Sequence, residues 1–371
     1  MTGATEDGTA SFMANAIRGQ IVAEHFREVE GLKLSTIGLG TYLGDSDDDT
    51  DESYRRAIGE AVSLGCNVLD SASNYRCQRS ERTLGSALVD LQGRGIDRDQ
   101  LVVATKGGYI PFDGSPPADP AEYVRTRFLE RSVFTQEDIA GGSHVLAPSF
   151  LEDQLQQSLA NLGVETIDIY YLHNPEAQLE SVTADVFEAR LTAAIEFLES
   201  AVADGRIAYY GTATWNAYRV APESKGSMSL AEVVGIAQEV AGESHHLRFV
   251  QAPYNLAMTE SFTTQSQSVD GEDQSLCQAA ESLGVHLLSS ASLAQGRLTT
   301  GLPEWLGTLF KGFATDAQRS LQFVRSTPGL TSALVGMRSV DHVRENLAVA
   351  RVPPARMEDF LKLFEVDSTE H

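Results

Sequence analysis

The feature that most constrains the fold of this chain is an alternation of short apolar runs with longer amphipathic stretches, repeated eight times. Each apolar run has the length of a buried strand, and the stretch that follows it has the 3.6-residue periodicity of a helix. The predicted strands are Leu34–Gly38, Asn67–Asp70, Leu101–Thr105, Ile167–Leu172, Ala208–Gly211, Leu247–Gln251, Val285–Ser289 and Thr331–Val335. The predicted helices are Glu52–Ser63, Ser80–Leu91, Ser149–Leu162, Ala184–Ala203, Leu230–Val240, Ser275–Leu283, Ala317–Val324 and Val340–Val349. Eight such units predict the α/β class and a closed (β/α)8 TIM barrel; an open doubly wound sheet stays an alternative on periodicity alone.

The 371 residues allow one large domain or two ordinary ones, and the evenly repeated units favour a single barrel over residues 26–371. Residues 1–25 are rich in small and polar types, so we expect a flexible tail there. Two long connections, at about 107–147 and 259–272, each follow a predicted strand. We therefore expect both on the C-terminal face of the barrel, where active sites form. A decorated surface or a subunit contact is the alternative for these loops.

The chain is strongly acidic, with 28 Lys+Arg against 52 Asp+Glu and a formal net charge of −24. Such a chain repels phosphate, so we expect neither nucleic acid nor an anionic membrane as a partner. Five of the basic residues are Lys and the rest are Arg. Two explanations stay open: a halophilic source, in which screening by salt makes an acidic surface tolerable, or a genome that favours Arg codons.

The sequence also predicts a cytoplasmic location. No apolar run approaches the roughly 18 residues that a membrane helix needs. The first 25 residues contain acids and no apolar core of a secretory signal. Cys66, Cys77 and Cys277 form no paired framework, which fits a reducing compartment.

The common nucleotide and metal motifs are absent from the sequence. The glycine-rich stretch Gly38–Gly44 places its last glycine one residue too late for the dinucleotide motif GxGxxG. It leads into the acid run Asp45–Asp51 rather than directly into a helix, so a Rossmann site is not supported. There is no P-loop, no HExxH motif and no residue cluster at metal-ligand spacing, so we predict no metal site.

Four titratable residues stand at or just after three consecutive predicted strands: Asp70, Tyr75, Lys106 and His173. Successive strand ends are neighbours around the rim of a barrel, so these side chains should converge at one mouth. Singly, each has an ordinary alternative, such as a helix cap, a rim ion pair or a local hydrogen bond. Jointly, they favour a functional site.

This quartet suits proton transfer to an alcohol oxygen. A free Tyr, with a pKa of about 10, is a poor acid at neutral pH. We expect the ammonium group of Lys106, held by Asp70, to stabilise the phenolate of Tyr75 and lower its pKa. His173 would hydrogen-bond the Tyr oxygen or a bound carbonyl. Tyr75 would then donate a proton to an alkoxide as it forms, which completes a hydride transfer from a cofactor.

Several motifs together resemble the aldo-keto reductase family over about residues 34–350. They are Ile37–Tyr42, Leu69–Tyr75, Ser80-Glu81 with Leu84-Gly85, Ala104–Lys106, Asp168–His173, Gln251–Asn255 and Gly336–Asn346. The resemblance implies a (β/α)8 barrel that binds NADP(H), less often NAD(H), without a Rossmann motif. It also implies a catalytic tetrad of Asp70, Tyr75, Lys106 and His173.

The resemblance further implies which residues bind the cofactor. The nicotinamide end would contact Gly40, Thr41, Tyr42, Asp70, Thr214 and Gln251. A loop carrying Leu293 and Gly296 would cover the pyrophosphate, and the adenosine end would meet Gly336, Arg338, His342, Glu345 and Asn346. Phosphate at the start of the last helix agrees with the general preference of helix N-termini for anions.

The sequence departs from the family pattern where the nicotinamide carboxamide is usually held. Ala213 and Thr214 stand where the family has Ser and Asn. We expect Thr214 to take over part of that contact, with Asn216 as the alternative in a shifted register.

Two further departures concern the ends of the cofactor. Ser290 replaces a ring that often stacks on the nicotinamide, and Trp215 or Tyr254 would then supply the wall. His342 replaces an Arg that often binds the 2′-phosphate, while Arg338 keeps a bidentate phosphate contact feasible. On balance the sequence favours NADP(H) over NAD(H).

The loop after Tyr75 is two residues longer than the family pattern and carries Arg76, Cys77 and Arg79. If these residues line the pocket, the two Arg favour an anionic or polyhydroxylated substrate. The alternative is ion pairing with Asp45–Asp51 across the rim.

The resemblance therefore predicts an NADP(H)-dependent oxidoreductase that interconverts a small carbonyl (aldehyde, ketone or sugar) and the alcohol, with Tyr75 as proton donor. Two alternatives are a nucleotide-binding regulatory barrel with weak catalysis and a lyase that forms a Schiff base on Lys106. The sequence gives no prediction of oligomeric state.

Overall fold

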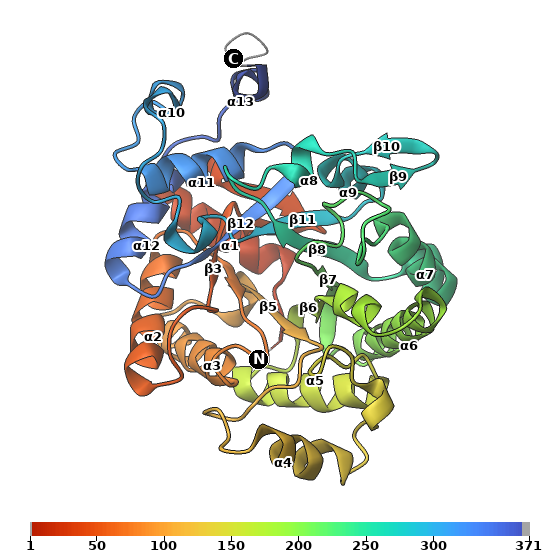
Figure 1. Cartoon of the computed structure of the whole chain (residues 1–371). Helices are drawn as coiled ribbons and strands as arrows, with labels where there is room; N and C mark the ends of the chain where they lie inside the picture. The colour runs from red at the N-terminus through yellow and green to blue at the C-terminus, as the bar shows by residue number, and fades with distance from the viewer. Residues whose placement is uncertain (1, 366–371) are drawn as a thin grey trace.

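The computed structural model describes residues 2–365, and its centre is a closed barrel of parallel strands (Figure 1). Around the barrel the strands follow the order β11-β12-β3-β4-β5-β6-β7-β8, so neighbours in sequence are neighbours in space. Their bounds are β3 (Ile37–Gly40), β4 (Val68–Asp70), β5 (Val102–Gly107), β6 (Ile167–His173), β7 (Ile207–Ala213), β8 (Leu247–Pro253), β11 (His286–Ser290) and β12 (Leu330–Gly336). The predicted (β/α)8 barrel is thereby confirmed.

A helix follows each barrel strand and packs on the outside of the barrel (Figure 1). These helices are α2 (Asp48–Ser63), α3 (Arg79–Gln92), α5 (Pro148–Leu162), α6 (Ala184–Ala203), α7 (Leu230–Ala241), α9 (Leu276–Ser282), α11 (Asp316–Ser326) and α12 (Val340–Leu347). Their apolar faces form one large core with the outward side chains of the strands. α10 (Glu304–Leu309) and α13 (Met357–Glu365) are additions near the C-terminus. No helix among residues 2–365 has both the length and the apolar character to cross a bilayer.

The barrel interior is filled by apolar side chains at its N-terminal end, which leaves the C-terminal end for polar residues. Val68, Val102, Ile169 and Phe249 belong to this inner cluster. An antiparallel hairpin of β1 (Phe26–Val29) and β2 (Leu32–Ser35) adds Leu34 and other apolar residues to it. Part of the first predicted strand therefore belongs to the hairpin, and the barrel strand begins later, at Ile37.

The N-terminal region differs from the loose tail expected over residues 1–25, because Glu6–Arg18 forms helix α1. The Thr5 side chain caps this helix by accepting a hydrogen bond from the Gly8 N–H. At Gly8 a Cβ atom would lie 2.3 Å from the Asp99 carbonyl oxygen, so α1 packs closely through small residues. Small and polar residues make up much of this segment, which explains why the sequence predicted a flexible tail instead of a helix.

The two long connections each contain regular structure. Residues 107–147 include α4 (Pro120–Val124), a π-helical turn and a small core of their own, in which Phe128 stacks on Phe134. Residues 259–272 include α8 (Glu260–Thr263) and the strand β9 (Gln267–Val269), which pairs with β10 (Glu272–Gln274). Gln267 donates to the Tyr218 carbonyl oxygen, so this hairpin packs on the loop that follows β7.

Candidate active site

A cavity of about 1030 Å³ opens at the C-terminal end of the barrel. Its walls come from strand ends and from the loops after β3, β4, β5, β6, β7, β11 and β12. At one end lie Tyr75 and His173, and at the other lie Arg338 and Asn346. Of residues 107–147, Tyr109 alone lines the cavity, and none of residues 259–272 does. The first loop therefore borders the cavity through one side chain.

A buried ion pair lies beneath the reaction end of this cavity. Lys106 Nζ lies 2.6 Å from Asp70 Oδ2 and donates to the Ser71 carbonyl oxygen at 2.7 Å. The second Asp70 oxygen accepts a hydrogen bond from Gln251 Nε2 at 3.0 Å. Burial lowers the pKa of Lys106, while the charge of Asp70 opposes that shift. The carboxylate thus holds the ammonium group in place and favours its charged form.

Tyr75 lies directly above this pair. Lys106 Nζ is 4.9 Å from the centre of the Tyr75 ring, and the Tyr42 ring meets Tyr75 edge-on at 5.0 Å. Burial, followed by the charge of Asp70, raises the pKa of Tyr75 well above its ordinary value of 10. This direction is opposite to the lowering that the sequence suggested, because burial and the charge of Asp70 both disfavour the phenolate. Tyr75 is accordingly a neutral phenol that holds its proton.

His173 stands on the other side of Tyr75, with the two ring centres 5.7 Å apart. Burial, with the charge of Lys106, lowers the pKa of His173 well below 6.5, so its imidazole is neutral at pH 7. The Tyr109 ring lies edge-on between His173 and His144, at 5.1 and 4.9 Å. These rings form an aromatic wall beside the Tyr75 ring.

His144, from the long loop after β5, supports this wall from behind. Its Nε2 lies 2.7 Å from the His173 carbonyl oxygen, and its Nδ1 lies 2.8 Å from Gln178 Nε2. Burial lowers the pKa of His144 to about 4, so the ring is neutral. A neutral ring that donates from Nε2 and accepts at Nδ1 satisfies both contacts.

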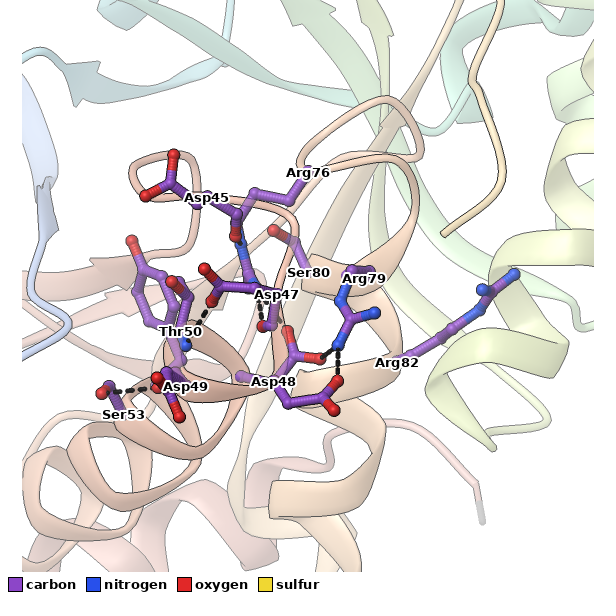
Figure 2. Close-up of polar contacts among 12 residues, drawn as sticks. Asp45, Asp47, Asp48, Asp49, Thr50, Ser53, Arg76, Arg79, Ser80 and Arg82 are labelled. Atoms are coloured by element: carbon purple, nitrogen blue, oxygen red, sulfur yellow. Dashed lines mark hydrogen bonds and ion pairs between the residues drawn. The ribbon is translucent and has the colours of Figure 1, made fainter. Parts of the chain in front are cut away.

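The two Arg residues after Tyr75 do not line the cavity; they pair with the acid run instead (Figure 2). Arg76 contacts Asp51, and Arg79 contacts both Asp48 and Asp51. The ion-pairing alternative is the one that the structure shows. Arg76 and Arg79 therefore give no reason to expect an anionic substrate.

The family model described as "Aldo/keto reductase family" matches residues 36–367. The chain belongs to this family. Its barrel also matches solved aldo/keto reductases over 93% of its length. One, from Klebsiella pneumoniae in complex with NADP and acetate, is 21% identical with a TM-score of 0.61 over 96% of that chain. Another, from Bacillus halodurans in its holo form, is 19% identical with a TM-score of 0.62 over 97% of that chain. At these identities the likeness shows the fold.

A curated relative from Schizosaccharomyces pombe is named as a voltage-gated potassium channel subunit beta. It is 28% identical over 191 residues, which are 51% of this chain. The match spans 44% of the length of that relative, under half of it.

Most cofactor residues that the aldo/keto reductase resemblance implies do line the cavity. They are Gly40, Tyr42, Asp70, Thr214, Gln251, Leu293, Gly296, Gly336, Arg338, His342, Glu345 and Asn346. Thr41 is the exception, because it does not line the cavity. Its hydroxyl turns away from the cavity and donates to the Asp70 carbonyl oxygen and to Ser71, because successive side chains in extended backbone point to opposite sides.

The donor set along the cavity suits a dinucleotide of the kind that aldo/keto reductases bind. Thr214 Oγ1 is buried in the wall with no hydrogen-bond partner among the described residues. Arg338 is the one Lys or Arg in the part of the cavity wall that the structure describes. It makes no ion pair there, which leaves its guanidinium available for a phosphate. A hydroxyl without a partner and a cation without an ion pair thus stand at opposite ends of the described cavity wall.

Several cavity residues were not singled out from the sequence. Tyr54, Asn74, Tyr109, Asn174, Gln295, Thr299 and Thr300 belong to this group. Of the two aromatic walls suggested in place of a ring at Ser290, Trp215 lines the cavity. Tyr254 instead packs on Phe323 in the outer core, with the ring centres 5.5 Å apart. Position just after a strand end was the available signal for Tyr109 and Asn174.

Proposed function

We propose that this protein is an NADP(H)-dependent oxidoreductase that interconverts a carbonyl compound and the corresponding alcohol. The observation that carries the proposal is the neutral phenol of Tyr75, set between the buried Lys106–Asp70 pair and His173 in one long cavity. An aldo/keto reductase of this fold was solved in complex with NADP, which supports the choice of cofactor.

The cofactor, when bound, supplies hydride to the carbonyl carbon. Gln251 and Thr214 would hold its carboxamide, and Arg338 would meet the phosphate at the adenosine end. Gln251 uses one N–H of Nε2 on Asp70, and its carbonyl oxygen would accept a hydrogen bond from the carboxamide N–H. Arg338 favours the 2′-phosphate of NADP(H) because its guanidinium can bind a phosphate with two hydrogen bonds, whereas His342, in place of an Arg, weakens the preference over NAD(H).

Tyr75 would donate its proton to the carbonyl oxygen as negative charge develops there. The phenolate that remains gains from the Lys106 ammonium under its ring, which Asp70 keeps charged and in place. Lys106 interacts more strongly with the phenolate than with the neutral phenol. Its stabilising contribution therefore grows as the proton leaves Tyr75 in the transition state. Neutral His173 would orient the carbonyl by a hydrogen bond.

The reaction end of the cavity favours an uncharged substrate. Tyr42, Tyr109 and Trp215 supply ring surfaces around Tyr75, and Asn174 supplies an amide. Neither Lys nor Arg lines this end among the described residues. We therefore infer an aldehyde, ketone or sugar without a carboxylate or phosphate.

The experiment that tests the proposal is Tyr75→Phe, assayed with NADPH against paired aldehydes that differ by one carboxylate, such as benzaldehyde and 4-carboxybenzaldehyde. We expect turnover to fall by a factor of about 10³ or more while NADPH affinity changes by less than about twofold. We expect the parent protein to prefer the uncharged aldehyde. A Tyr75→Phe variant that turns over at the parent rate would contradict the mechanism.

The geometry does not favour the Schiff-base alternative. The Lys106 side chain is 1% exposed, and its Nζ is occupied by Asp70 and the Ser71 carbonyl. A Schiff base needs an uncharged amine that can reach a substrate carbonyl. Borohydride trapping that left an adduct on Lys106 would reverse this judgement.

A further inference from the structure

The segment that follows Tyr75 has an unusual backbone. Arg76, Cys77 and Gln78 all lie in the left-handed region, with φ of 49°, 55° and 68°. Residues other than glycine rarely adopt this conformation, and three in succession persist only where the surroundings hold them. Arg76 is also joined directly to Tyr75, so whatever fixes Arg76 fixes the backbone of Tyr75.

Arg76 is fixed by the loop between β3 and α2. Its side chain is 1% exposed, Nε donates to the Asp45 carbonyl oxygen at 2.8 Å, and Nη2 contacts the carboxylate of Asp51. A weaker contact reaches the Asp47 carbonyl oxygen (Figure 2). The guanidinium therefore fastens the backbone of this loop, whose first residues form the cavity wall, to the first turn of α2.

The guanidinium also touches the cavity wall through Tyr54. It lies 5.5 Å from the centre of the Tyr54 ring, a cation–π contact. The Tyr54 hydroxyl donates to the Leu43 carbonyl oxygen at 2.8 Å, and both residues line the cavity. Tyr42, next to Leu43, meets Tyr75 edge-on. Arg76 thus connects the two sides of the Tyr42–Tyr75 contact.

The same left-handed turn fastens the loop after β5. The Cys77 carbonyl oxygen accepts from the Gly114 N–H at 2.8 Å, and Gln78 Nε2 donates to the Phe112 carbonyl oxygen at 3.0 Å. This loop carries Tyr109 into the cavity. This short segment of the loop after β4 therefore holds two neighbouring loops, and the three loops contribute Tyr42, Tyr75 and Tyr109 to the reaction end.

We infer that Arg76 is a positioning residue: its buried guanidinium holds the loop after β3 and the backbone of Tyr75 in register, so that the phenol faces the reacting oxygen. The inference deepens the proposed function and rests on it for its kinetic consequence. Arg76 does not line the cavity, so it acts through Tyr75 and Tyr42. The nearby Arg79 pairs with the same acid run, but its side chain is more exposed and points to Asp48 (Figure 2). Arg79 provides the matched control.

The test compares Arg76→Gln, Arg76→Lys, Arg79→Gln and Asp51→Asn in the full chain, with one uncharged aldehyde and NADPH. We expect Arg76→Gln to lower kcat by about 30-fold, with KM and the NADPH dissociation constant within about threefold of the parent, because a displaced reacting group loses rate rather than binding. Arg76→Lys keeps the charge and should recover part of kcat. Asp51→Asn should lower kcat less than Arg76→Gln, since the backbone contacts of Arg76 remain. Arg79→Gln should stay within about threefold.

A second measurement does not depend on turnover. Hydrogen exchange followed by mass spectrometry should show faster exchange over residues 41–46 and 108–114 in Arg76→Gln and parent-like exchange in Arg79→Gln. The inference is overturned if Arg76→Gln matches Arg79→Gln in both kcat and exchange. It is also overturned if Arg76→Lys has a kcat as low as that of Arg76→Gln and if KM rises as kcat falls. If Arg76→Gln does not fold, Arg76→Lys and Asp51→Asn decide by the same two readouts. A parent without turnover on any aldehyde would defeat the proposed function, and the exchange data would then decide the loop contacts alone.

Discussion

Thr214 is a polar side chain whose hydroxyl is buried without a partner among the described residues. Its backbone N–H donates to the Gln251 carbonyl oxygen at 2.8 Å, which places the two side chains that would hold the carboxamide next to each other. An unpaired buried hydroxyl is costly unless a ligand completes it. The proposed function therefore assigns Thr214 a hydrogen bond to the cofactor.

We expect Thr214→Val, which keeps the shape and removes the hydroxyl, to raise the NADPH dissociation constant by about five- to tenfold, the worth of one hydrogen bond. Thr214→Ser serves as the control and should stay close to the parent. Quenching of protein fluorescence by NADPH measures both. Equal affinity in the Val variant would assign the hydroxyl a role in packing only.

Single residues could be predicted where a strand end fixed their place. Asp70, Lys106 and His173 stand on neighbouring strands, so the barrel alone brings them together. The Thr41 side chain lies outside the cavity wall because a shift of one position along extended backbone turns a side chain away. The direction of the Tyr75 pKa shift also could not be predicted, since the sequence does not show the burial that is its largest cause.

Helix α1 shows how an element escapes prediction from the sequence. Its contacts are made by small residues and one ring, Phe12, which is buried against Phe26 with ring centres 6.2 Å apart. The Ala4 N–H donates to Asp168 at 2.6 Å at the start of β6, so the segment is fastened ahead of the helix as well. The barrel strands were predicted because each is a continuous apolar run, whereas these tertiary contacts leave no such pattern.

We expect Phe12→Ala to lower the free energy of unfolding by about 3 kcal/mol, the usual cost of removing a buried ring. Because α1 packs on the end of the barrel remote from the cavity, kcat should stay at the parent value. Urea unfolding and a standard turnover assay measure the two quantities. A variant with unchanged stability would mean that α1 is only loosely attached in solution.

At the scale of the whole molecule, a formal charge of −24 opposes the binding of a polyanionic cofactor. The opposing field is long-ranged and is screened as the Debye length falls from about 30 Å at 10 mM salt to about 8 Å at 150 mM. A contact between Arg338 and phosphate is short-ranged and is screened much less. We expect NADPH affinity to rise over this range of NaCl, and to rise more steeply in Arg338→Gln. Affinity that fell with salt would show that local attraction dominates.

Acid should destabilise the fold through its buried imidazoles. Burial, together with the charge of Arg325, lowers the pKa of His25 from 6.5 to about 3, and the Gly65 carbonyl oxygen lies 3.2 Å from its Nε2. The unfolded chain therefore binds a proton between pH 6.5 and 3 that the folded chain does not, so stability falls as the pH falls through this window.

At pH 5 we expect this group to account for about 2 kcal/mol of the loss relative to pH 7. Urea unfolding at both pH values, for the parent and His25→Gln, should show a smaller loss in the variant by about that amount. Parallel losses in the two proteins would mean that His25 titrates normally in the folded state.

The attachment of residues 4–18 across the N-terminal end of the barrel has a practical consequence. Ala4 is bonded at the start of β6, and the cavity opens at the opposite end of the strands. A fusion partner, a tag or a solid support joined ahead of residue 2 would therefore stand behind the barrel. Such a tether leaves the mouth free for small molecules to enter and leave, which makes this end the one to choose for immobilisation.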